Sequence, residues 1–458
     1  MPTHIIDSLV YRDAWGSDEM RAIFDDVPRT QGWLDVIAAL AQAQAEVGLI
    51  PAVAAQEITR ICRVENLDME SLRQGYRETG HSTMGLIRDL KNLCRDDAGE
   101  WVYYGATVQD IVDTWYNVAL LKAWDISFRD LTGIATILAD LAEAHRDTTM
   151  VGRTHGQAGL PITFGFKVAV WVREIARHRA RLRAVRPRLE VGQLAGGVGS
   201  LSSFGDVGIE LQARFFGKLG LRPPDIVWNT ARDSWAEFFS VLVLIAGTCD
   251  KIGHEVYTLQ RSDIGEVREG FVRGTVGSIT MPHKRNPEIA EHLGSLSRLV
   301  RHNVAVLTES LVHDHERDGR SWKAEWAVIG PVCLMAGATL RLTKTMCAHL
   351  EVDEARMWSN LESTQGYILS EAVMLALAQI IGKQTAHEIV YERSMQAFEA
   401  GRPLKEALLQ DERLLAHMTR EEIGALFDYG RHTGLCVEFV DRVVEMTRAE
   451  LQEQERTA

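Results

Sequence analysis

Hydrophobic residues recur at steps of three and four along most of the chain, which is the spacing of an amphipathic helix. In the segment WLDVIAALAQAQAEVGLI, Leu34, Ile37 and Leu40 fall on one stripe, and Pro51 follows as a stop signal. No stretch alternates as a strand does, so the pattern predicts an all-α protein with a bundle of long helices. The further helical stretches are 111–146, 163–189, 204–220, 232–268, 288–312 and 328–349.

The stretch from Trp235 to Ile252 is apolar on more than one face, which indicates a helix that is buried on all sides. In a chain of this size we expect that burial to involve other subunits; a central core helix within one subunit is the alternative. The longest apolar run, 238–249, is too short to cross a bilayer, which needs ~20 residues. No membrane partner is therefore expected.

The length of 458 residues suggests about three domains, or one long helical domain with appendages. The helical pattern breaks near 105–110 and again near 349–353. We therefore expect an N-terminal helical domain, a central domain of long helices and a C-terminal helical domain, with the boundaries 1–110, 111–355 and 356–458.

Composition and charge narrow the class of protein. Hydrophobic residues make up 46% and charged residues 25%, as in globular proteins. The 50 basic and 63 acidic residues give a net charge of −13, which would repel a phosphate backbone, so no nucleic acid is expected. The N-terminus resembles no signal peptide, and the six cysteines form no CxxC pair. A cytoplasmic protein with reduced thiols is therefore expected.

Three loops interrupt the helical pattern with small and polar residues: 103–110 (YYGATVQD), 152–157 (GRTHGQ) and 274–287 (GTVGSITMPHKRNP). The third combines glycines, a hydroxyl, a lysine and an asparagine. Glycines let a backbone approach a ligand closely, and the polar groups can hold a carboxylate. Taken alone, such a loop is more often an ordinary surface loop.

Taken together, the three loops favour a functional site over ordinary surface loops, because they resemble a known family. GSITMPHKRNP resembles the signature loop of the fumarase/aspartase superfamily, usually GSSxMPxKxNP, and GATVQDIVDT and GRTHGQAGLPITFGFK resemble the first two superfamily regions, in the right order. The resemblance implies a mostly helical, three-domain fold and a homotetramer. It also implies a central bundle that four subunits share and active sites that three subunits build. The implied reaction is β-elimination from a succinyl-type substrate, usually releasing fumarate, without a metal or cofactor.

The resemblance also implies roles for individual residues. Ser278 matches the catalytic base, which the loop N–H groups and nearby positive charge must activate. Lys284 and Asn286 match positions that grip the substrate carboxylate. His155 matches the general acid or leaving-group partner of many members, and Glu291 matches a glutamate that pairs with this histidine and raises its pKa.

The remaining matches concern substrate binding. Thr107 and Gln109 match polar carboxylate ligands of the first region, and Thr154 matches one in the second. His81, in TGHSTMG, matches a histidine of the adenylosuccinate lyase branch. Arg317 can supply a further contact to the substrate.

Two branches of the superfamily compete. The segments WNTARD and HERDGRSWKAEW resemble 3-carboxy-cis,cis-muconate cycloisomerase, whereas the Thr-His loop, His81 and Glu291 resemble adenylosuccinate lyase. Ala14–Ser17 stands where many adenylosuccinate lyases carry an Arg-Tyr-Ser-Arg motif, and Trp326 stands in place of another arginine. Without these arginines, the phosphate of a nucleotide substrate would lack the paired guanidinium N–H donors that usually bind it.

We therefore expect a lyase of the cycloisomerase-like group that keeps an acid–base histidine. Its expected reaction is β-elimination from a substituted succinate, a small dicarboxylate, with C–N cleavage of an N-substituted aspartate as the first expectation, and the expected product is fumarate. The alternatives are a 3-carboxy-cis,cis-muconate cycloisomerase, an adenylosuccinate lyase, and an inert structural protein of the crystallin type. His313 and His315 have no third ligand at a sensible spacing, so they are expected to be solvated helix-end residues, and no metal is predicted.

Overall fold

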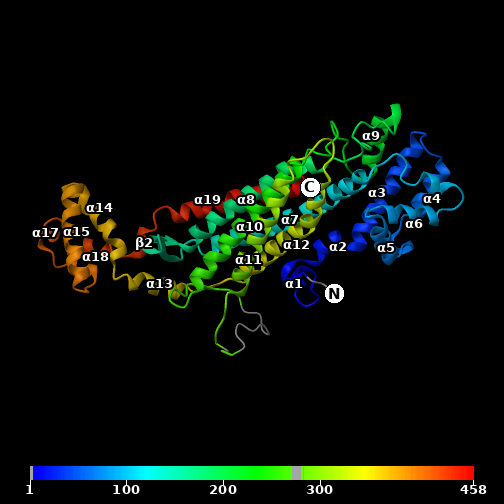
Figure 1. Cartoon of the computed structure of the whole chain (residues 1–458). Helices are drawn as coiled ribbons and strands as arrows, with labels where there is room; N and C mark the ends of the chain where they lie inside the picture. The colour runs from blue at the N-terminus through cyan, green and yellow to red at the C-terminus, as the bar shows by residue number, and fades with distance from the viewer. Residues whose placement is uncertain (1–3, 271–279, 282, 458) are drawn as a thin grey trace. The chain divides into compact units, whose positions relative to one another are not determined.

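The computed structural model of the chain describes residues 4–270, 280–281 and 283–457. Helices dominate the described part, and the all-α fold class is confirmed (Figure 1). The long helices are α7 (Val108–Ala144), α8 (Phe164–Leu189), α10 (Asp233–Gln260), α11 (Glu288–Glu309), α12 (Gly319–Ala348) and α19 (Cys436–Thr457).

Most of these helices follow the predicted stretches closely; α12 is the clearest exception. It begins at Gly319 rather than at 328, because its first turns bury charge instead of apolar side chains. Glu325, which is 1% exposed, forms an ion pair there with the equally buried Arg232. The helix prediction rests on the regular spacing of apolar residues, and a helix face that packs against a buried guanidinium lacks that spacing.

A β-hairpin was missed by the sequence analysis. Strands β1 (Thr149–Thr154) and β2 (Gln157–Thr163) pair antiparallel, with an irregularity in register between Val151 and Arg153. The segment 149–163 contains three glycines and a proline and alternates poorly, which hides a strand. A second, shorter pair joins β3 (Val267–Arg268) to β4 (Glu351–Val352).

The chain divides into two compact units that are not consecutive in sequence. Unit 1 comprises Met1–Asp130, His178–Gly247 and Ser295–Arg341, and unit 2 comprises Leu131–Arg177, Thr248–Gly294 and Leu342–Ala458. The long helices α7, α8, α10, α11 and α12 have residues in both units. The expected domain boundaries at 110 and 355 stay a prediction.

Unit 1 contains the N-terminal helices. In this unit α3 packs against α4 and α9, and α5 packs against α6. Gly75 and Gly85 allow the close approach of α5 and α6, because a Cβ on Gly75 would lie 2.7 Å from the Gly85 Cα. The helices are α1 (Arg12–Trp15), α2 (Asp18–Phe24), α3 (Asp26–Glu46), α4 (Ala52–Ile61), α5 (Met69–Thr79), α6 (Met84–Leu93) and α9 (Gly208–Lys218).

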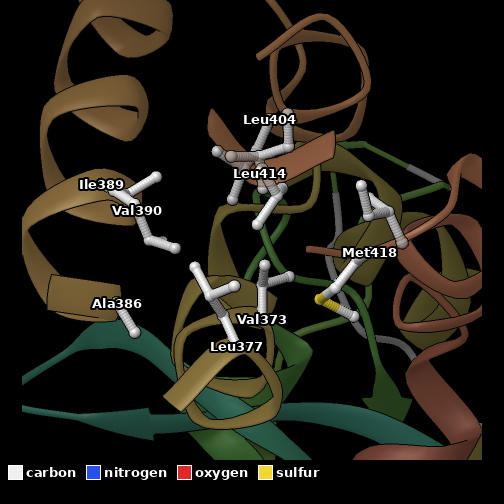
Figure 2. Packing of buried hydrophobic residues seen from close by; sticks show 10 residues of the cluster. Val373, Leu377, Ala386, Ile389, Val390, Leu404, Leu414 and Met418 are labelled. Carbon is white, nitrogen blue, oxygen red and sulfur yellow. The ribbon is translucent and has the colours of Figure 1, made fainter. Parts of the chain in front are cut away.

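Unit 2 contains a C-terminal group of helices with its own apolar core, drawn in orange in Figure 1. Figure 2 shows Val373 and Leu377 facing Ile389, Leu404 and Leu414 in this core. Burial of such side chains stabilises the group by about 1.5–3 kcal/mol each. The helices are α13 (Glu354–Ser363), α14 (Ser370–Ile381), α15 (Lys383–Glu399), α16 (Leu404–Leu408), α17 (Glu412–Leu415) and α18 (Arg420–Ala425).

By length and hydropathy alone, helix α12 could cross a membrane. However, 67% of its most apolar window is buried inside the protein. Core helices of globular proteins share this property, so α12 gives no reason to expect a bilayer.

Candidate active site

The predicted first region lies at the N-terminus of α7, within unit 1. Asp110, in the first turn of this helix, is fully buried and accepts backbone N–H bonds from Thr107 (2.9 Å), Ala195 (2.8 Å) and Gly196 (3.2 Å). Burial raises the pKa of Asp110 to about 7, although these N–H groups and the Arg317 charge act in the opposite direction. The carboxyl group ties the loop before α7 to the loop that carries Ala195.

Two of the predicted substrate-binding residues meet directly in this unit. Arg317 Nη1 donates to Thr107 Oγ1 over 2.9 Å, and its Nη2 donates to the Gly196 carbonyl oxygen at 3.4 Å. Arg317 Nε is buried and makes no hydrogen bond to a described residue. A guanidinium has five N–H donors and the two bonds above use two of them, so this guanidinium beside a hydroxyl can bind a carboxylate.

Gln109 lies in the first turn of α7, two residues after Thr107, and is fully buried. Its amide nitrogen donates to Asp113 Oδ2 and to the Asn229 carbonyl oxygen, each over 2.9 Å. Its oxygen, Oε1, is buried and has no hydrogen-bond donor among the described residues. The two N–H groups of the Gln109 amide therefore point toward buried acceptors in the interior of unit 1.

His81 is exposed just before α6, and the Thr83 hydroxyl lies 3.4 Å from its Nδ1. Thr83 also hydrogen bonds to Tyr103, whose pKa is raised by burial and by the nearby Asp110 charge. A short polar chain thus runs from His81 toward the first region. Its role in substrate binding stays a prediction.

The second region is the turn of the β1–β2 hairpin, in unit 2. Thr154 ends β1 and pairs with Gln157, and His155 occupies the turn with a φ of 53°. A histidine in this left-handed region is uncommon, and Gly156 follows it with a φ of 75°. The turn leaves both Thr154 and His155 exposed, where a ligand can reach them.

An ion pair between a partly exposed arginine and a buried carboxylate holds the hairpin beside this turn. Glu266 is fully buried and accepts from Arg153 Nη1 (2.9 Å) and Nη2 (2.7 Å) and from Asn360 Nδ2 (2.7 Å). Arg153 immediately precedes Thr154, and Glu266 immediately precedes β3. The carboxylate therefore joins the hairpin to β3 and α13.

The third region lines a cavity of about 1140 Å³ in unit 2. Lys284, Asn286 and Glu291 all contribute to its walls, and Arg261 and Arg268 add positive charge. Excess positive charge in one hollow suits a dianionic ligand. The other lining residues are Tyr257, Gln260, Ser262, Gly265, Met281, His283, Arg285 and Pro287.

Glu269 supports this cavity from behind. Its carboxylate accepts the backbone N–H groups of Ile289 (3.1 Å) and Ala290 (2.6 Å), in the first turn of α11. Burial raises the pKa of Glu269, while the two N–H groups act to lower it. The bonds hold the helix start that carries Glu291.

Ser278, the predicted base, lies outside the described residues. Its position relative to Lys284, and the pairing of His155 with Glu291, stay predictions. Thr107, Gln109, His81 and Arg317 belong to unit 1, and the matches of the second and third regions belong to unit 2: Thr154, His155, Lys284, Asn286 and Glu291.

His313 differs from the expectation of a solvated helix-end residue. Both of its ring nitrogens are buried and neither makes a hydrogen bond of good geometry to a described residue. Burial lowers the pKa of His313, and the nearby Arg232 charge adds to this effect. His315 is exposed, as expected. The described residues contain no group of three or more side chains that could hold a metal ion.

The sequence analysis also missed four buried charged residues in unit 1. Asp110, Asp113, Arg232 and Glu325 are each at most 2% exposed. A signal existed in the acids at positions 110 and 113, which share one face of a helix with apolar residues. Charged residues are almost never fully buried unless paired, so this spacing predicts internal partners.

Comparison with known proteins identifies the class. A family model described as "Lyase" matches residues 14–301, and one described as "Adenylosuccinate lyase C-terminus" matches residues 366–443. Because the first match covers more than half of the chain, the protein belongs to this lyase family, which is the fumarase/aspartase superfamily. The predictions of an enzyme and of this superfamily are confirmed.

Individual relatives come from several branches. The chain is 40% identical to N-acetyl-S-(2-succino)cysteine lyase of Dickeya dadantii, over 97% of this chain and 98% of the relative. It is 38% identical to adenylosuccinate lyase of Methanocaldococcus jannaschii, over 97% and 96%. The solved structure of 3-carboxy-cis,cis-muconate lactonizing enzyme from Pseudomonas putida superposes with a TM-score of 0.91 at 35% identity, covering 95% of this chain and 98% of that chain.

Proposed function

We propose that the protein is a lyase that eliminates a small, phosphate-free leaving group from a 2-substituted succinate and releases fumarate. The observation that carries this proposal is the cationic cavity that contains Lys284 and Asn286. The Thr107–Arg317 pair supports it, because it offers a second set of carboxylate donors. A substrate with two carboxylates would match two such groups.

The proposed chemistry divides its steps between the third region and the second. Ser278 removes a proton from the substrate carbon next to one carboxylate, and this carboxylate takes up the electron pair as a dianion. Lys284 and Asn286 stabilise that charge. The pair then forms the double bond of fumarate while the bond to the leaving group breaks, and His155 gives a proton to the departing atom.

A sulfur-linked substrate is the first candidate. The name N-acetyl-S-(2-succino)cysteine lyase, carried by the Dickeya dadantii relative, places the succinyl group on sulfur. We expected cleavage of a C–N bond, and an N-substituted aspartate remains the second candidate because of the adenylosuccinate lyase relative. Both substrates present the same succinyl half to the cavity.

The surroundings of Trp326 support a leaving group without phosphate. Trp326 stacks edge-to-face on Trp322 with ring centroids 4.6 Å apart, where an adenylosuccinate lyase would have an arginine. Each charged hydrogen bond that a phosphate loses costs about 1.5–3 kcal/mol. Two such losses lower kcat/KM for adenylosuccinate by about 10² or more.

The test is a substrate panel with fumarate absorbance and product mass as readouts. It compares N-acetyl-S-(2-succino)cysteine, an N-aryl aspartate, adenylosuccinate and 3-carboxymuconate, with Ser278→Ala as the inactive control. Fumarate release from the first two compounds supports the proposal. Lactone formation from 3-carboxymuconate alone would replace it by the cycloisomerase, and no turnover of any of the four compounds would contradict both assignments.

Three further expectations belong to this proposal. We propose a homotetramer with active sites shared between subunits, a cytoplasmic location, and catalysis without a cofactor. The exposed apolar side chains on the long helices support the first, and they are considered in the Discussion. The six cysteines, which form no CxxC pair, support the second.

A further inference from the structure

A group of charged and aromatic side chains lies beneath the first region, inside unit 1. Asp113 accepts from Arg232 Nη1 (2.7 Å), from Trp322 Nε1 (2.9 Å) and from Gln109 Nε2 (2.9 Å). Arg232 also donates to Glu325 through Nε (3.0 Å) and Nη2 (2.6 Å). Three segments far apart in the sequence therefore meet at one carboxylate.

This group leaves the Gln109 amide only one orientation. Both partners of Gln109 Nε2 are acceptors, the Asp113 carboxylate and the Asn229 carbonyl oxygen, so the nitrogen and not the oxygen must face them. A primary amide has two N–H groups, and both are used. Gln109 has no donor left for a substrate carboxylate.

The oxygen of the Gln109 amide, in contrast, is an acceptor that could serve a water molecule or a ligand. Gln109 Oε1 is buried without a donor among the described residues. Leaving a buried acceptor unpaired costs about 1–3 kcal/mol, so it requires a bound water or a proton-bearing group of a ligand. The hydrogen-bond donors of Arg317 and Thr107 lie close by, because Thr107 directly precedes the helix that carries Gln109 and Arg317 donates to it.

We propose that Asp113, held between Arg232 and Trp322, is a positioning residue that fixes the Gln109 amide with its N–H groups inward. Carboxylate recognition in the first region then belongs to Thr107 and Arg317. Gln109 offers the substrate only an acceptor, toward an N–H or O–H group or a water molecule. This role rests on the proposed lyase function and refines its substrate contacts.

A pair of matched tryptophan substitutions tests this role. Trp322→Phe removes one hydrogen bond to Asp113 and keeps an aromatic ring against Trp326. Trp124→Phe is the control, because Trp124 is also buried and its indole N–H donates instead to the Leu182 carbonyl oxygen, over 2.6 Å. Both variants lose one buried indole hydrogen bond, and both should lose a similar amount of thermal stability.

The expected result is a selective loss of function in Trp322→Phe. Its kcat/KM should fall about tenfold or more, and its dissociation constant for fumarate should rise, while Trp124→Phe stays within about threefold of wild type. Equal losses in the two variants, at equal stability, would overturn the positioning role.

A double-mutant cycle gives an independent result. Gln109→Met removes both amide bonds, so adding Trp322→Phe should then lower kcat/KM much less than it does in wild type. Additive losses would mean that Asp113 does not act through Gln109, and the proposal would be wrong. A wild-type protein that releases no fumarate and binds none would refute the lyase function itself.

Discussion

Glu325 is a carboxyl group that takes up a proton more readily in the folded protein than in water. Burial raises its pKa to about 7, the nearby Asp113 adds to this effect, and the Arg232 charge opposes it. In the unfolded chain the group ionises near its ordinary pKa of 4.5. Between these two values the folded protein binds a proton that the unfolded chain does not.

The free energy of unfolding should therefore fall as the pH rises from about 4.5 to 7, by up to about 3 kcal/mol for this group. Glu325→Gln removes this contribution, so its stability relative to wild type should improve over the same window. Thermal melts of both proteins at intervals from pH 5 to pH 8 measure the difference. A difference that is constant with pH would show that Glu325 does not titrate there.

If His155 gives a proton to the departing atom, as proposed, its importance should depend on the leaving group. A thiol, with a pKa near 8.5, can leave as a thiolate, whereas the nitrogen of an N-aryl aspartate must take up a proton as the bond breaks. His155→Asn should lower kcat/KM by about 10²–10⁴ for the N-aryl substrate and by about tenfold for the sulfur-linked one. His387→Asn, an exposed histidine on α15, is the control, and equal losses for both substrates would contradict the acid role.

The β1–β2 hairpin carries the second region, and the Arg153–Glu266 ion pair links it to the rest of unit 2. Glu266→Ala leaves Arg153 without its carboxylate. The Arg153 side chain is 23% exposed, so the loss should be smaller than that of breaking a fully buried pair, about 3–5 kcal/mol. The melting temperature should fall by several degrees, and activity should fall with it because Thr154 follows Arg153 directly.

The control for this change is Asp263→Ala. Asp263 pairs with Arg261 at 3.1 Å, and both side chains are more than half exposed. Exposed pairs contribute about 0–1 kcal/mol, so this variant should melt close to wild type. Equal destabilisation in the two variants would show that the Arg153–Glu266 pair does not hold the hairpin.

Helices with an apolar inner face could be predicted from the sequence, and those with a charged inner face could not. The stretch 163–189 matches α8 almost residue for residue, because hydrophobic period and helix coincide there. The first turns of α12 were missed because Glu325 faces Arg232, and the hairpin was missed because Gly152 and Pro161 break its alternation. Periodicity reports apolar burial, and it does not report burial of ion pairs.

The candidate site shows the same limit. The loops that contain Thr107, Lys284 and Asn286 stand out because they interrupt a helical pattern, but the predicted roles of these residues came from the resemblance to the superfamily. The contact between Thr107 and Arg317 spans 210 positions and could not be derived from spacing. The group around Asp113 was invisible for the same reason, since its members are dispersed along the chain.

At the scale of the whole molecule, the long helices keep apolar side chains in contact with solvent. Val170 on α8 is 47% exposed, Leu244 on α10 is 48% exposed, and Leu299 on α11 is 38% exposed. The other face of α10 is buried within the chain, with Phe238 and Leu242 at most 1% exposed. Helices that are apolar on the solvent side as well indicate a surface that other subunits cover.

If four subunits cover these surfaces, each active site should combine residues from different chains. Ser278→Ala and His155→Asn are each expected to be inactive as pure proteins. After mild dissociation and mixing in equal amounts, about a quarter of the sites should contain both intact residues, because each contributing subunit is the intact one half of the time. Recovery of about that fraction of wild-type activity, in a species that sediments as a tetramer, supports shared sites; a fully active monomer, or mixing without recovery, contradicts them.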